Sequence, residues 1–160
     1  MILFILLLNV VCGCLFYFTL KKRKYTIPER TALLIILYTS GVMSLTITMN
    51  VQLLLHLYNY SMFITTLIGL GIGVGFGSIF TRESIIMGYN HGFIGGLMGA
   101  MLSAVILNPS LCGLPASYGN SIGKNAFIFS LFSFFLSALS IFTFHVSIVR
   151  HPFRSNGRQC

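Results

Sequence analysis

Apolar residues run along this chain in five long stretches, which are separated by shorter polar connections. The stretches cover residues 1–20, 31–49, 61–80, 85–107 and 125–149. A helix needs about 20 mostly apolar residues to cross a hydrocarbon core roughly 30 Å thick, so each stretch has close to the required length. The pattern predicts an all-α protein, a multi-pass transmembrane helical bundle of about five spans that forms a single integral membrane domain over residues 1–160.

The third stretch alternates glycine with apolar residues, a pattern that also occurs in strands. Lipid offers no partners to the backbone groups of an isolated strand, whereas a helix pairs these groups within itself. We therefore expect a helix over residues 61–80, and we leave open whether it crosses the membrane fully or is partly re-entrant. Residues 81–84 are expected to form a short turn before the fourth span.

The composition agrees with a membrane location. Hydrophobic residues make up 56% of the chain and charged residues 8%, whereas soluble domains carry about 25% charged residues. The formal net charge of +8 would suggest a nucleic-acid partner in a soluble chain. Here the basic residues flank the apolar stretches, so we expect the lipid bilayer as a partner and no nucleic acid.

The positions of the basic residues predict an orientation. If the chain crosses five times, nine of the ten Lys and Arg residues fall on one side of the membrane, and only Lys124 falls on the other. Cytoplasmic segments carry an excess of Lys and Arg. We therefore expect a cell-membrane protein with an outside N-terminus and a basic cytoplasmic tail over residues 150–160. The nine residues are Lys21, Lys22, Arg23, Lys24, Arg30, Arg82, Arg150, Arg154 and Arg158.

Glycines in the third stretch follow two helix faces. Gly69, Gly73 and Gly77 share one face, and Gly71 and Gly75 lie roughly opposite. Small residues allow two helix backbones to approach closely, which is a main source of helix association in lipid. Two such faces predict a helix that lies between two others.

The fourth stretch carries a second set of glycines at steps of four, three and four residues. Gly88, Gly92, Gly95 and Gly99 fall within an arc of about 60° on a helix. We interpret them as a groove for a neighbouring helix. The third and fourth stretches are therefore expected to form the glycine-rich centre of the bundle, with the first helix and the Phe-rich face of the last one outside.

Small polar residues mark further faces for helix contact. The second stretch holds Thr39, Ser40, Gly41, Ser44, Thr46 and Thr48. The fifth stretch carries a stripe of serines at steps of three, four and three: Ser130, Ser133, Ser137 and Ser140. Such hydroxyls usually bond to the carbonyl one turn earlier or bridge helices, so we expect the stripe to face protein.

Three methionines and a histidine form another stripe on the fourth stretch. Met87, His91, Met98 and Met101 lie within an arc of about 80° on a helix. Thioether and imidazole are the ligands that Cu(I) or another soft metal cation prefers. The alternative is that methionine fills gaps between helices, while His91 and the adjacent Asn90 hydrogen-bond to other helices.

The inventory of charged residues argues against an enzyme. The only two acidic residues, Glu29 and Glu83, lie at the boundaries of the spans, so the spans contain no carboxylate for acid–base chemistry. We expect no cofactor apart from the soft metal ion that the stripe would bind. The preferred function is a packing, assembly or accessory subunit that forms a homo-oligomer or joins other membrane protein subunits. The alternative is a small channel or transporter for a soft metal cation.

Overall fold

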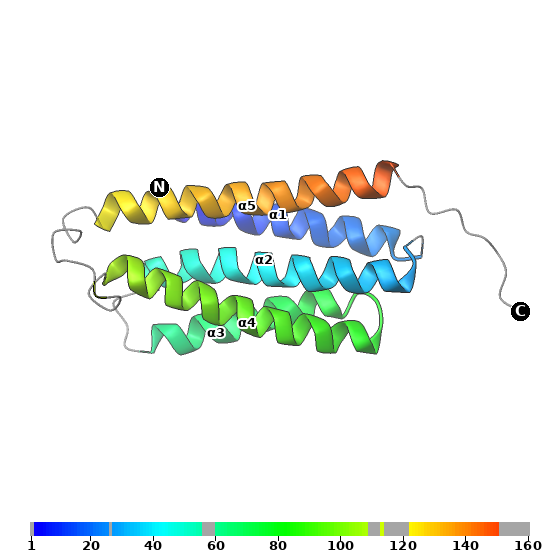
Figure 1. Cartoon of the computed structure of the whole chain (residues 1–160), viewed down its shortest axis with the longest axis horizontal. Helices are drawn as coiled ribbons and strands as arrows, with labels where there is room; N and C mark the ends of the chain where they lie inside the picture. Colours follow the sequence, from blue (N-terminus) through cyan, green and yellow to red (C-terminus); the bar gives the residue numbers. More distant parts are fainter. Residues whose placement is uncertain (1, 26, 56–59, 109–112, 114–121, 151–160) are drawn as a thin grey trace, which may run out of the picture.

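The computed structural model describes residues 2–25, 27–55, 60–108, 113 and 122–150. Within these ranges the chain forms five helices, and successive helices run in opposite directions along the bundle (Figure 1). The all-α helical bundle predicted from the sequence is confirmed. The helices are α1 (Ile2–Arg23), α2 (Glu29–Leu55), α3 (Ser61–Gly77), α4 (Arg82–Leu107) and α5 (Ile122–Arg150).

Four of these helices, α1, α2, α4 and α5, are long and apolar enough to cross a membrane. The apolar helix α3 is shorter, with 17 residues, which corresponds to about 26 Å at the usual rise of 1.5 Å per residue. It ends at Gly77, so the prediction of a helix to residue 80 was too long at its C-terminal end. The alternating glycines do not break α3, because a helix pairs its own backbone groups.

The start of α4 corrects the prediction of a turn over residues 81–84. The helix begins at Arg82, and Thr81 is its N-cap. The Thr81 hydroxyl oxygen accepts a hydrogen bond from the backbone N–H of Ser84 at 3.4 Å, which satisfies one of the unpaired donors of the first turn. The connection between α3 and α4 is therefore only four residues long, 78–81.

Helix α2 lies in the middle of the bundle, between the pair α1 and α5 and the pair α3 and α4 (Figure 1). It contacts each of the other four helices. The glycine-rich helices α3 and α4 pack closely against each other and against α2. The prediction that α3 and α4 form the centre is corrected, because α2 lies between the two pairs.

Among the described residues, many polar side chains are buried and many large apolar side chains are exposed, in contrast to a water-soluble protein. Asn9 and Asn50 are completely buried, whereas Phe63 is 68% exposed and Phe132 61% exposed. Apolar side chains on the outside and hydrogen-bonded polar groups on the inside are expected when the surroundings are lipid. Among the fully buried polar residues are Thr39, Ser40, Ser44, Thr46, Thr48 and Thr65.

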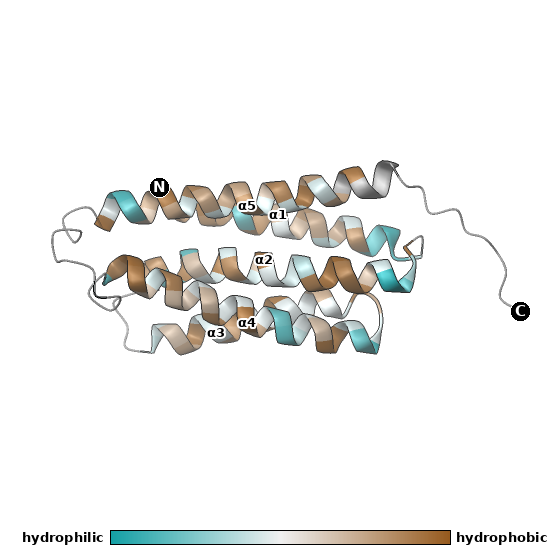
Figure 2. Cartoon of the chain, viewed as in Figure 1, coloured by the Kyte–Doolittle hydropathy of each residue, from teal (hydrophilic) through white to brown (hydrophobic). Residues whose placement is uncertain are grey.

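Hydrophilic residues gather at the ends of the helices (Figure 2). The end at which α1 finishes and α2 and α4 begin carries Lys21, Lys22, Arg23, Lys24, Arg30 and Arg82, and we call it the basic end. Lys124 lies at the opposite end, in the first turn of α5. The predicted basic tail after Arg150 lies outside the described residues.

Candidate packing and assembly surfaces

The closest helix contact joins the backbones of α3 and α4. A Cβ atom at Gly73 would overlap the carbonyl oxygen of Gly88 and would lie 2.7 Å from the Cα of Gly92. A Cβ atom at Gly77 would lie 2.6 Å from the carbonyl oxygen of Ser84. Only glycine allows this approach. We call the contact the glycine seam, and its members are Gly69, Gly73 and Gly77 of α3 with Gly88, Gly92 and Gly96 of α4.

The glycines of α4 contact two neighbouring helices, which corrects the prediction of a single groove. Gly88 and Gly92 face α3, as described above. A Cβ atom at Gly95 would lie 2.5 Å from the carbonyl oxygen of Gly41, and one at Gly99 would lie 2.6 Å from the carbonyl oxygen of Leu45. Both of these contacts are with α2. One helix therefore holds its two neighbours with two adjacent rows of glycines.

A side-chain hydrogen bond strengthens the junction of α2, α3 and α4. Ser44 donates from its hydroxyl to the carbonyl oxygen of Gly92 at 2.6 Å. A Cβ atom at Gly69 would lie 2.5 Å from the same hydroxyl oxygen. Gly96 also belongs to this junction, since its Cβ would lie 3.1 Å from the Cα of Gly69. Gly96 was not predicted as a packing residue because it falls outside the four-three-four spacing.

The second glycine face of α3 has no helix against it. A Cβ atom at Gly71 or Gly75 would meet nothing within 4 Å. The prediction that α3 lies between helices on two opposite faces was therefore wrong for the described part of the chain. The glycine seam and the contact with α2 both lie on the other side of α3, where Gly69 and Gly73 are buried.

Amides and hydroxyls connect α1, α2 and α5. Asn9 of α1 donates to the Ser133 hydroxyl at 3.4 Å and accepts from the Ser137 hydroxyl at 2.6 Å. Asn50 of α2 donates to the same Ser133 hydroxyl at 2.8 Å. All four side chains are buried, so these hydrogen bonds form out of contact with lipid. We call this set the amide–serine network.

The remaining serines of the predicted stripe are buried on the same helix. Ser140 donates to the carbonyl oxygen of Leu136 at 2.8 Å and reaches the Tyr38 hydroxyl at 3.5 Å. Ser130 is fully buried, and its hydroxyl has no partner among the described residues, as is also true of the Asn50 side-chain oxygen. The stripe thus lies inside the bundle, and Ser133 and Ser137 bond to two asparagines that were not predicted as site residues. Asn9 could have been predicted as a site residue, because it is a polar residue within an apolar stretch.

The predicted metal ligands lie on the outer face of α4. Met87 is 39% exposed, Met98 56% and Met101 49%, while His91 is half-buried, with its Nδ1 atom 3.1 Å from the carbonyl oxygen of Met87. Met87 and Met98 are separated by three turns, about 16 Å along the axis, so a single ion cannot contact both. Metal binding stays a prediction, and only part of the stripe could contact any one ion.

An amide lies on this same outer face. Asn90 is exposed, and it lies about 60° around the helix from Met87. Its side chain forms no hydrogen bond within the described part of the chain. Eight residues separate it from Arg82, which places it about 12 Å along the axis from the basic end. The outer face of α4, as we use the term, consists of Met87, Asn90, His91, Ile94, Met98 and Met101.

Long apolar helices, an apolar exterior and an interior that buries polar as well as apolar side chains together indicate a helical membrane protein. Comparison with protein-family models, with curated proteins and with solved structures gives no match. Arguments about function therefore rest on the geometry of the chain itself.

Proposed function

We propose that this chain is a non-enzymatic assembly subunit of the cell membrane, and that it associates through the outer face of α4 with a second copy of itself. The observation that carries the proposal is the exposed amide of Asn90 on a membrane-spanning helix. An amide that faces hydrocarbon without a partner is unfavourable by several kcal/mol on transfer scales, about 4–8 for water to cyclohexane. A partner helix removes this cost.

A second copy is well suited to this position because an amide carries both donors and an acceptor. Two asparagines that face each other across a twofold axis can each donate to the other, which is the arrangement of an isologous dimer. The neighbouring methionines support the same interface, since flexible thioether side chains fit irregular surfaces between helices. Placement of Met98 on the outside favours this role over that of a ligand along an interior path.

The proposal is tested by replacing Asn90 with leucine. We expect the dissociation constant of the dimer in vesicles to rise about tenfold, because each interhelical hydrogen bond in a membrane contributes about 0.6–1.7 kcal/mol and two are lost. Single-molecule photobleaching of labelled protein gives the dimer fraction as a function of dilution. Thr143→Val is the matched control, since Thr143 is an exposed residue of α5 that bonds only to carbonyls of its own helix.

Two results would count against the proposal. If the wild-type protein were monomeric at all dilutions, it would not form the proposed dimer. Equal dissociation constants for wild type and Asn90→Leu would show that copies meet through another surface.

We also propose that the basic end lies in the cytoplasm, as the excess of Lys and Arg there suggests. Single-cysteine variants test this orientation. In intact cells, a membrane-impermeant maleimide is expected to label Lys124→Cys, and to label Lys22→Cys only after the membrane is opened. The reverse labelling pattern would show that the protein has the opposite orientation in the membrane, with the same fold.

A further inference from the structure

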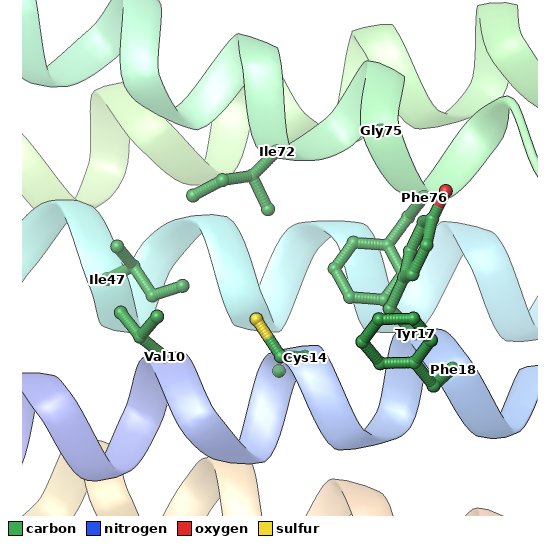
Figure 3. A pocket seen from close by; sticks show the side chains of 9 residues that line it. Val10, Cys14, Tyr17, Phe18, Ile47, Ile72, Gly75 and Phe76 are labelled. Carbon is green, nitrogen blue, oxygen red and sulfur yellow. The ribbon is translucent and has the colours of Figure 1, made fainter.

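A groove of about 390 Å³ lies between α1, α2 and α3. Its lining includes Val10, Cys14, Tyr17 and Phe18 of α1 and Ile72 and Gly75 of α3 (Figure 3). The side chains drawn there are apolar except for the Cys14 thiol and the Tyr17 hydroxyl, which is the single oxygen in the view. A lining with so few polar groups does not provide the two to four partners that hold an ordered water molecule.

Glycine creates the groove. Because Gly75 has no side chain and no atom lies within 4 Å of where its Cβ would be, α3 presents an open surface toward α1. The groove lies along membrane-spanning helices, with Val10 at one end and Tyr17 and Phe18 at the other (Figure 3). Its surroundings are therefore hydrocarbon chains, and its long axis follows the direction in which such chains lie.

The face of α1 that lines the groove continues into basic residues. Cys14, Tyr17 and Lys21 follow at steps of three and four residues, so their side chains lie on the same side of the helix. Lys22 and Arg23 complete the last turn, and both are exposed. A lipid chain in the groove would thus place its headgroup beside a cluster of positive charge.

A second, smaller hollow lies at the basic end. It has a volume of about 160 Å³, and its lining includes Lys24, Phe80, Thr81 and Glu29. Phe80 packs against a buried apolar cluster that includes Phe16, Leu20 and Ile27. Tyr17, which lines the large groove, packs against the same cluster. The hollow offers an ammonium group and a hydroxyl to a phosphate, and four consecutive basic residues outweigh the single carboxylate of Glu29.

We propose that this groove is a binding site for one anionic glycerophospholipid. One acyl chain lies between α1 and α3 over Ile47, and the phosphate lies between Lys21 and Lys24. Basic residues next to a membrane attract anionic headgroups, and charged donors form the strongest hydrogen bonds to phosphate. The site uses none of the residues of the outer face of α4, so the lipid-binding proposal and the proposed dimer can be tested independently.

The chain contains no tryptophan, so one introduced tryptophan is a unique fluorescent reporter. Phe18→Trp places it at the groove. Phe142→Trp is the matched control, because Phe18 is 66% exposed and Phe142 67% exposed, and Phe142 lies on α5 toward the same end of the bundle. Each variant is reconstituted in phosphatidylcholine vesicles with small amounts of brominated phosphatidylglycerol or brominated phosphatidylcholine, which quench tryptophan on contact.

For Phe18→Trp, half-maximal quenching is expected at a mole fraction at least fivefold lower for phosphatidylglycerol than for phosphatidylcholine, since each basic residue near an anionic headgroup is worth about fivefold. Phe142→Trp is expected to show no preference. Two further changes should abolish the preference of Phe18→Trp for phosphatidylglycerol. One is Gly75→Leu, which fills the groove at an open position, and the other is replacement of both Lys21 and Lys24 with glutamine.

Three results would overturn the proposal. The first is equal quenching of Phe18→Trp by both lipids, and the second is a preference that survives both Gly75→Leu and the glutamine variant. The third is a disulfide-linked dimer, formed on oxidation of a variant in which Cys14 is the only cysteine. Such a dimer would show that a second copy of the chain fills the groove.

Discussion

Alanine at Gly73 is expected to lower the free energy of unfolding by about 3 kcal/mol, because overpacking a close contact costs about 1–3 kcal/mol and here the neighbouring atoms are backbone. The new methyl group would overlap the carbonyl oxygen of Gly88 and press against the Cα of Gly92. Neither atom can move without shifting α4 as a whole. Titration with a denaturing detergent, followed by circular dichroism, measures the change.

Gly71→Ala is the matched control for this prediction. It adds the same methyl group to the same helix, two residues away, where nothing lies within 4 Å of the new atom. Alanine is favoured over glycine in a helix by about 1 kcal/mol in water, so stability should stay the same or rise. Similar losses of stability in both variants would show that the glycine seam does not hold α3 against α4.

Loss of Asn9 is expected to have the second largest effect on stability. Asn9→Leu removes two hydrogen bonds that join α1 to α5, each worth about 0.6–1.7 kcal/mol in a membrane protein. Helix α1 has much less of its apolar segment buried than α2, so it depends more on these bonds. The expected loss is about 2 kcal/mol, measured by the same detergent titration.

A double-mutant cycle separates the hydrogen bond from the change in shape. Asn9→Leu and Ser137→Ala are expected to show a coupling energy of about 1 kcal/mol, since each removes one partner of the same bond. Asn9→Leu and Ser140→Ala should be additive, because Ser140 bonds to Leu136 and Tyr38 instead. Additivity in both pairs would mean that the hydrogen bond between Asn9 and Ser137 contributes nothing to holding α5 against α1.

Much of this fold could be predicted from apolar run lengths and small-residue spacing. The five helices follow from the apolar stretches, since lipid forces each backbone to pair with itself. The glycine seam follows from steps of four, because residues so spaced share a helix face. The predictions for the end of α3 and the start of α4 were wrong by a few residues, since the N-cap at Thr81 depends on a local hydrogen bond within a polar segment.

What the sequence could not provide was the assignment of each face to a neighbour. Gly71 and Gly75 have the same spacing as Gly69 and Gly73, yet only the latter pair is packed against other helices. Periodicity identifies a face and carries no information about what lies opposite. For the same reason, the Met and His stripe could be located on α4, but its outward direction required the positions of the other helices.

The amide–serine network has a consequence for the synthesis of the protein. Asn9 lies in α1, whereas its partner Ser133 is synthesised 124 residues later. At about 5–20 residues per second, this interval is on the order of 6–25 seconds. During that time the amide of α1 has neither of its native serine partners. A chain truncated before α5 would lack both serines permanently, so the Asn9 amide would have to pair with another group or remain unsatisfied in the membrane.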